Sequence, residues 1–191
     1  MAADQKRKLT GVVLLSGGID SAACVRYYLD LGFRLRGLFI DYGQRARDNE
    51  GESAVKVANY FDIPLDKLSL SPIKNFGPGE IRGRNAFLII AALLFYPKLK
   101  GILSLGIHSG TPYYDCSQQF ISDITTIIDA YAGGEVRIDA PFLAWDKLTI
   151  YAYCEEKDVP IQLTYSCESG TDPPCGKCLS CKDREVLSVS R

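Results

Sequence analysis

The feature that most constrains the fold is an apolar run that leads directly into a serine- and glycine-rich loop. Gly11-Val12-Val13-Leu14-Leu15 shows no alternation of polar and apolar residues, and such a run predicts a parallel strand buried on both faces. Residues 21–31 then have the apolar spacing of one helix face, and Gly32 follows as a helix-ending residue. A buried strand joined to a helix by a tight loop is the first unit of a parallel α/β sheet.

The same alternation of strand and helix continues along the chain without a linker or an internal repeat. We therefore predict a single domain over residues 1–191, an α/β fold with an open, mostly parallel, doubly wound sheet. Ligands of such folds bind at the carboxyl ends of the strands, here after Leu15, Ile40 and Leu105. The predicted strands are 11–15, 36–40, 65–70, 102–105 and 136–140, and the predicted helices are 21–31, 49–61, 84–96, 120–131 and 147–156. A loop is predicted over residues 71–83. From residue 162 onward, we predict a loop, a cysteine cluster and a short tail.

The composition argues against partners that are nucleic acids or membranes. The chain has 22 Lys and Arg against 23 Asp and Glu, a net charge of −1, whereas proteins that grip nucleic acid carry a basic face. The short basic run 6–8 is expected to be a solvated tail. The longest apolar run, residues 86–96, is shorter than the roughly 20 residues of a membrane span. Without the pattern of a signal peptide at the N-terminus, a cytosolic protein is expected.

The loop after the first strand, Ser16-Gly17-Gly18-Ile19-Asp20-Ser21, has the residues of an anion-binding site. Two glycines let backbone N–H groups point inward, and the helix N-terminus adds partial positive charge. The loop has neither the Gly-Lys-Ser/Thr of a P-loop nor the G-x-G-x-x-G of a dinucleotide site. It resembles the S-G-G-x-D-S signature of the N-type ATP-pyrophosphatases, and an ordinary capped turn is the alternative. The resulting prediction is ATP binding by Leu15, Ser16, Gly17, Gly18, Ile19, Asp20 and Ser21, with catalytic roles for Ser16, Asp20 and Ser21, and Mg²⁺ held by Asp20.

A second polar segment, Asp41-Tyr42-Gly43-Gln44-Arg45, follows the second predicted strand. Its position at a strand end suits contact with an adenine, and an arginine suits recognition of phosphate or carboxylate. Taken alone, the segment could be a plain polar loop. Together with the glycine loop it adds four predicted nucleotide-binding residues, which are Asp41, Tyr42, Gln44 and Arg45.

Four of the seven cysteines form the pattern C-x7-C-x2-C-x2-C near the C-terminus. Four thiolates suit tetrahedral Zn²⁺ in a structural site, so we predict a zinc-binding segment over residues 163–185. An iron–sulfur cluster is the main alternative, because C-x2-C-x2-C also occurs in ferredoxin-type runs. The predicted ligands are Cys167, Cys175, Cys178 and Cys181. The other three cysteines are expected to be buried, namely Cys24, Cys116 and Cys154.

Taken together, these motifs resemble the 7-cyano-7-deazaguanine synthase family over nearly the whole chain. The first motif is shared by many ATP-pyrophosphatases, whereas Gly83-Arg84-Asn85 and the four-cysteine segment are far more particular to this family. The resemblance is carried by Ser16 to Ser21, Asp41 to Arg45, Gly83-Arg84-Asn85, Asp115-Cys116, Trp145-Asp146-Lys147, Leu163-Thr164-Tyr165-Ser166-Cys167 and Cys175-Gly176-Lys177-Cys178.

The resemblance implies a C–N ligase that adenylates the carboxylate of 7-carboxy-7-deazaguanine. Ammonia would displace AMP to give an amide, and a second ATP would convert the amide into the nitrile. The family also implies a homodimer. Arg84, Asn85 and Asp115 are the predicted substrate-binding residues, with helix capping by Asn85 and a turn carboxylate at Asp115 as alternatives. His108 is given no role, and Trp145 is expected to lie in the core.

Some residues depart from the family pattern, and they lie around the expected substrate pocket. Ala46 stands where the family has His, Tyr114 where it has Pro, and the loop from Gly106 to Cys116 is shorter. A paralogue that transfers the acyl group to another amine, including one on a protein, is therefore an alternative, and such relatives occur beside antiphage systems. A tRNA-thiolating enzyme and a non-catalytic nucleotide-binding zinc module are further alternatives.

Overall fold

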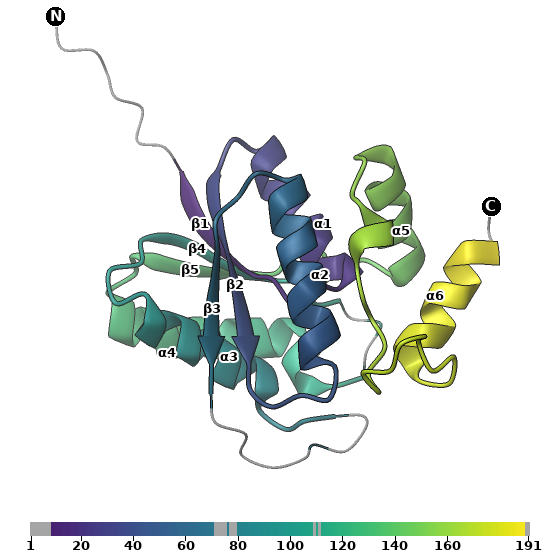
Figure 1. Cartoon of the computed structure of the whole chain (residues 1–191). Coiled ribbons are helices and arrows are strands. Elements are labelled where there is room, and N and C mark those ends of the chain that lie inside the picture. The colour runs from purple at the N-terminus through teal and green to yellow at the C-terminus, as the bar shows by residue number, and fades with distance from the viewer. Residues whose placement is uncertain (1–8, 71–75, 77–79, 109, 111, 190–191) are drawn as a thin grey trace, which may run out of the picture.

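The computed structural model describes residues 9–70, 76, 80–108, 110 and 112–189. Five parallel strands form one sheet in the order β3-β2-β1-β4-β5, flanked by helices (Figure 1). The elements are β1 (Thr10–Leu14), α1 (Ile19–Asp30), β2 (Arg34–Asp41), α2 (Arg47–Tyr60), β3 (Leu65–Ser69), α3 (Arg84–Phe95), β4 (Gly101–Leu105), η1 (Tyr114–Cys116), α4 (Gln118–Ala132), β5 (Val136–Asp139), α5 (Lys147–Glu156), η2 (Ile161–Leu163) and α6 (Leu179–Val189).

Helices cover both faces of the sheet, as predicted for a doubly wound fold. Alternate side chains from Val12 to Leu15 point to opposite faces of the sheet. Val13 and Leu15 belong to the buried cluster on one face, while Val12 and Leu14 belong to the cluster on the other. Helices α1, α2 and α5 pack on the first face, and α3 and α4 pack on the second (Figure 1). Residues 11–15 are therefore buried on both faces of the sheet, which accounts for the unbroken apolar run at the start of the chain.

The strand order reverses between β1 and β4. From β1 the chain proceeds outward to β2 and β3, and then it crosses back to β4 and β5 on the other side. The loops after β1 and β4 consequently lie at the point where the strand order reverses, the usual ligand position in this architecture. Gly106 brings the two loops together: a Cβ there would lie 2.6 Å from the backbone of Asp20.

The predicted strands and helices are confirmed, with ends that differ by no more than two residues from the prediction. The predicted burial of the separate cysteines is also confirmed, since Cys24 and Cys154 are fully buried and Cys116 is 6% exposed. Trp145 packs against the core, as expected. Most of the predicted loop 71–83 and the basic run 6–8 lie outside the described residues. Among the described residues, no helix is long and apolar enough to cross a membrane.

One prediction was wrong: the end of the chain contains helix α6, not a loop and a tail. The segment is short and mixes four charged residues among eleven, so its sequence alone gives only a weak signal of a packed helix. Tertiary hydrogen bonds hold it in place. Arg184 donates from Nη1 to the carbonyl of Thr164 and from Nη2 to the carbonyl of Ile161, each at 2.9 Å. The Glu168 carboxylate accepts from the backbone N–H of Ser180 in the first turn.

Three distant segments meet at Gly17 in the loop after β1. Its φ of +83° lies in the left-handed region, and a Cβ would stand 2.4 Å from the carbonyl oxygen of Glu50 and 2.9 Å from the amide nitrogen of Ala54 on α2. The carbonyl of Gly17 accepts a hydrogen bond of 2.9 Å from the amide of Tyr165. Only glycine satisfies both the backbone angle and the close approach to α2.

Gly17→Ala and Gly32→Ala form a matched pair that separates these two effects. Both glycines have φ near +80°, but no atom lies within 4 Å of a Cβ at Gly32. Gly32→Ala should lower the free energy of unfolding by about 1 kcal/mol through backbone strain alone. Gly17→Ala should cost more, because α2 must also move. Chemical denaturation measures both, and equal losses would show that contact with α2 does not matter.

Candidate active site

The glycine loop presents its hydroxyl and carboxylate groups at the N-terminus of α1. The hydroxyl of Ser21 donates to the carbonyl of Gly18 at 2.9 Å, and the hydroxyl of Ser16 lies 3.2 Å from that of Ser21. Gly18 is the N-cap of α1, and Asp20 lies in the first turn. The helix therefore directs free N–H groups and partial positive charge toward this loop, where an anion would be stabilised.

Three adjoining cavities open beside this loop at the carboxyl ends of the strands. A cavity of about 180 Å³ between β1, β2 and β4 has both apolar and polar walls, with Leu38, Ile40 and Leu105 on the apolar side. A second, of about 240 Å³, borders Ser16, Gly18 and the residues after Thr164. The third, of about 350 Å³, extends toward α6. Among the described residues, two side chains border all three cavities: Glu50 and Arg84.

The structure brings most of the predicted loop residues to these cavities. Ser16, Gly18, Ile19 and Asp20 border the second cavity, and Ser21 borders the first. Leu15 is the exception, because it is fully buried and its side chain packs in the core. Gly17 does not border the three cavities, and its backbone instead contacts α2 and Tyr165.

The segment after β2 is folded into a compact turn by its own side chains. The amide of Gly43 donates to Asp41 Oδ1 at 2.9 Å, and the amide of Tyr42 donates to Gln44 Oε1 at 2.9 Å. Tyr42 and Gln44 border the first and third cavities, and Arg45 borders the third. Asp41 instead borders a separate depression on the outer side of α2. Its role in this structure is therefore to hold the turn.

Of the three predicted substrate residues, Arg84 faces the cavities most fully. Asn85 is 4% exposed, and its Nδ2 donates to the carbonyl of Asp115 at 2.9 Å. The carboxylate of Asp115 in turn accepts from the amide of Asn85 at 3.2 Å. Asp115 thus lies behind Asn85 and satisfies an N–H at the start of α3. The pair fixes the position from which Arg84 projects.

Lys147 is a site residue that the sequence reasoning passed over. It opens α5, and its Nζ lies 2.7 Å from both carboxylate oxygens of Asp20. The two side chains are 25% and 21% exposed, so the pair is partly shielded from solvent. Its motif Trp145-Asp146-Lys147 was recognised only as part of the family resemblance. A lysine at a helix start after the last strand was the available signal.

Burial perturbs the titration of several groups around the third cavity. Burial lowers the pKa of His108, which favours its neutral form, and it raises the pKa of Cys116 to about 11. A thiol with this pKa stays protonated near neutral pH, so Cys116 does not act as a nucleophile at rest. Burial also raises the pKa of Glu50, although the hydrogen bond from Gln44 and the charge of Arg84 act in the opposite direction.

The four predicted cysteine ligands come together at the C-terminus. Their sulfur atoms all lie within 4.8 Å of one another, and those of Cys175 and Cys181 are 4.0 Å apart. Zinc–sulfur bonds of about 2.3 Å in a tetrahedron require separations near 3.8 Å, so the cluster could hold a metal ion. Although burial raises the pKa of Cys167, backbone N–H groups of Cys175, Ser169 and Thr171 lower it to about 5.

The segment that carries these cysteines lies against both predicted nucleotide loops. The amide of Tyr165 bonds the carbonyl of Gly17, and Asn49 Nδ2 donates to the carbonyl of Gly170 at 3.1 Å. A Cβ on Gly170 would lie 2.2 Å from the carbonyl oxygen of Arg45. The cysteine cluster therefore anchors a strap that crosses the glycine loop and the turn after β2.

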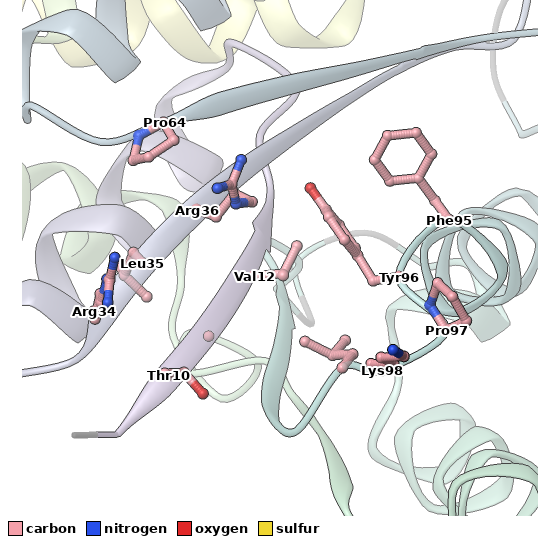
Figure 2. A pocket seen from close by; sticks show the side chains of 12 residues that line it. Thr10, Val12, Arg34, Leu35, Arg36, Pro64, Phe95, Tyr96, Pro97 and Lys98 are labelled. Atoms are coloured by element: carbon pink, nitrogen blue, oxygen red, sulfur yellow. The ribbon is translucent and has the colours of Figure 1, made fainter. Parts of the chain in front are cut away.

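A further cavity of about 480 Å³ lies at the other end of the sheet (Figure 2). It is bordered by the first residues of β1 and β2 and by the chain after α3. Figure 2 shows Tyr96 pointing from the end of α3 toward the strands, near Arg36. Both side chains bind Asp66, at 2.6 and 2.8 Å. Asp66 thus pairs with both of these groups, and none of the predicted site residues borders the cavity.

Comparison with solved structures supports the fold. The chain superposes on NMN synthetase from Francisella tularensis with a TM-score of 0.53 and 15% identity, covering 96% of this chain and 76% of that one. A 4-thiouridine synthetase bound to RNA and ATP gives a TM-score of 0.54 and 18% identity, covering 94% of this chain and 50% of that one. At these identities the likeness concerns the fold alone, and it agrees with the predicted class.

Comparison of sequences identifies the family. The family model described as queuosine biosynthesis protein QueC matches residues 10–82 and 78–187. The 7-cyano-7-deazaguanine synthases of two Synechococcus strains, CC9311 and CC9605, are 31% and 32% identical, over 95% and 93% of this chain and 94% and 91% of their own lengths. That of Aquifex aeolicus is 29% identical over 91% of this chain and 94% of its own length. The chain therefore belongs to the QueC family of queuosine biosynthesis proteins.

Proposed function

We propose that this enzyme adenylates the carboxylate of 7-carboxy-7-deazaguanine with ATP and delivers the acyl group to ammonia. The amide would then be activated by a second ATP and converted to 7-cyano-7-deazaguanine. The observation that carries the proposal is the junction of three cavities between the glycine loop, the turn after β2 and Arg84. Relatives named 7-cyano-7-deazaguanine synthase match nearly the whole chain, which supports the same substrate.

The chemistry of each cavity suggests what it would hold. The first cavity suits an adenine ring, because Leu38 and Leu105 offer an apolar side and polar groups line the rest of it. The cavity that borders Ser16, Gly18 and Lys147 suits the phosphates, because hydroxyl, N–H and ammonium groups all donate to anionic oxygens. The cavity under α6 would take the deazapurine acid, with Arg84 placed where the acid and the nucleotide meet.

The proposed reaction needs no nucleophile from the protein. A carboxylate oxygen of the substrate attacks the α-phosphorus of ATP, and pyrophosphate leaves. The nitrogen of ammonia then bonds to the carboxyl carbon, and AMP leaves with the electrons of the broken C–O bond. Donors aimed at the departing pyrophosphate lower the barrier of the first step. This role falls to Ser16, Ser21 and Lys147.

Asp20 and Lys147 would change partners during this cycle. A magnesium ion, when bound, would screen the charge of the pyrophosphate, and Asp20 is the carboxylate at the loop that would hold it. Lys147 now neutralises Asp20 at 2.7 Å. With Asp20 engaged elsewhere, Lys147 becomes free to bind a phosphate oxygen. The ion pair keeps both groups in place between turnovers.

A second candidate is transfer of the acyl group to an amine on a protein. The lining of the third cavity favours this candidate. Ala46, which is 3% exposed, lines the cavity at a position where the family pattern has histidine, and the cavity extends to Asp183 on α6. A small wall residue leaves space for an acceptor other than ammonia, and carboxylates attract a cationic amine. The two candidates share the adenylation step and differ in its acceptor.

Counting AMP per product tests the proposal. Incubation with ATP, magnesium, ammonium and 7-carboxy-7-deazaguanine should form two AMP for each nitrile. One AMP per product would indicate a single acyl transfer, and no acid-dependent AMP would overturn the proposal. Asp20→Asn should slow AMP formation by about 100-fold or more, because the developing charge loses its counterion site. Asp129→Asn, on the exposed side of α4, should leave the rate unchanged.

We also propose that the cysteine cluster holds a structural zinc ion. The purified protein should contain one zinc ion per chain and no visible absorption, whereas an iron–sulfur cluster would be coloured. Cys178→Ser should lose the metal and expose the amides of residues 163–171 to hydrogen exchange, since the strap loses its anchor. Cys154→Ala alters a fully buried cysteine that packs in the core and is not part of the cluster, and it should retain the metal. Full zinc content in Cys178→Ser would contradict the assignment.

A homodimer through the outer side of α3 is proposed as the assembled form. Phe87, Ile90 and Leu94 are 40%, 46% and 82% exposed and lie at positions i, i+3 and i+7, on one side of the helix. On α4, in the same layer, Ile127 and Tyr131 are 46% and 78% exposed. An apolar stripe of this kind on a helix indicates a surface that is covered by a partner.

Introducing charge on this stripe should dissociate the dimer. The double variant Ile90→Glu and Leu94→Glu would bury two carboxylates in the interface, and sedimentation should then report a monomer. Leu31→Glu is a suitable control, because Leu31 is 54% exposed after α1, on the other face of the sheet. A monomeric wild type, or a double variant that remains dimeric, would refute the assigned interface.

A further inference from the structure

Glu50 is a carboxylate in the cleft to which the reaction above gives no role. It lies on α2 and, with Arg84, borders all three cavities. Its own backbone carbonyl packs against Gly17 of the glycine loop. The side chain therefore stands where nucleotide and acid would meet, at the place where an acyl adenylate would present its carbon.

Hydrogen bonds fix this carboxylate and leave one of its oxygens available. Glu50 Oε2 accepts from Gln44 Nε2 at 3.0 Å. Gln44 is itself locked, because its Oε1 accepts from the amide of Tyr42 and its Nε2 also donates to the carbonyl of Ile40. Within the part of the chain that the structure describes, Oε1 of Glu50 makes no hydrogen bond. A positioned carboxylate with a free oxygen is the geometry of a proton acceptor.

The other carboxylates near the cleft are engaged or more distant. Asp20 is paired with Lys147, and Glu168 accepts from the amide and hydroxyl of Ser180. Asp183 on α6 borders the second and third cavities but not the first. Glu50 is thus the carboxylate at the junction of the three.

An amine acceptor requires such a group. Ammonia in neutral water is present mainly as ammonium, which has no lone pair for attack. We propose that Glu50 binds ammonium in the cleft and accepts its proton, which releases ammonia against the acyl adenylate; this inference rests on the proposed adenylation. The new N–C bond forms as the carbonyl π electrons move to oxygen. Glu50 passes the first proton to solvent. The carbonyl then re-forms as the C–O bond to AMP breaks, AMP takes that bonding pair, and the emptied carboxylate of Glu50 accepts the extra proton from nitrogen.

The surroundings of Glu50 suit this task. Burial raises the pKa of its carboxyl, and the Asp41 carboxylate acts in the same direction, while Gln44 and the Arg84 guanidinium lower it. A carboxylate whose pKa is raised is a stronger base than one in water, and the opposing groups favour its ionised form. Tyr42, the other titratable side chain of the neighbouring turn, has its pKa raised by burial and stays neutral.

Glu50→Gln tests the inference, because the amide retains the shape and a hydrogen bond to Gln44 but accepts no proton. Adenylation is measured first, as exchange of pyrophosphate into ATP with 7-carboxy-7-deazaguanine and no ammonium; the variant should retain it. The kcat/KM for ammonium should fall about 100-fold, the usual contribution of a general base. Hydroxylamine, which is already unprotonated at neutral pH, should react with the variant as fast as with the wild type.

The outcomes separate this inference from the proposed function. If the wild-type protein shows no acid-dependent exchange, the adenylation itself is refuted. If exchange occurs but Glu50→Gln has unchanged ammonium kinetics, loses exchange, or slows equally with hydroxylamine, the role of Glu50 is refuted. Glu52→Gln is the matched control, because Glu52 lies two residues further on α2 with its side chain 71% exposed. It should match the wild type with both nucleophiles.

Discussion

The close contact of Gly17 with α2 is the constraint on which the rest of the site depends. A backbone with positive φ, pressed against the carbonyl of Glu50 and bonded by Tyr165, joins the end of β1, the start of α2 and the C-terminal strap. Any side chain at this position would separate them. The conformation of the glycine loop is therefore fixed by its neighbours, and not by its own sequence alone.

The cysteine cluster is connected to the glycine loop through the hydrogen bond between Tyr165 and Gly17. The four sulfurs lie away from the three cavities, but the segment between Tyr165 and Gly170 runs from them across both predicted nucleotide loops. A cross-link at the end of such a strap reduces the conformational freedom of the loops beneath it. A metal here would contribute to nucleotide binding by position, without touching the nucleotide.

Charged side chains in the site lie beside groups of opposite charge. Lys147 neutralises Asp20, and Arg84 lies near Glu50 across the junction of the cavities. Neighbouring opposite charges offset part of the cost of holding charged groups in a partly buried cleft, where an isolated charge would be costly. An anionic ligand that draws the lysine and the arginine toward its phosphates would leave the two carboxylates for a metal ion and for an amine.

The sequence by itself determined the sheet, its helices on both faces and the places of the loops, because periodic burial of apolar side chains leaves a local record in strands and helices. It also placed Ser16, Asp20 and Ser21 together, since they share one loop. Lys147, Glu50 and helix α6 were decided by tertiary structure. Lys147 reaches Asp20 across 127 positions, Glu50 enters the cleft because α2 packs on Gly17, and α6 is held by hydrogen bonds to distant carbonyls. Contacts between residues so far apart in the chain have no periodicity, so only the folded arrangement of the strands brings them together.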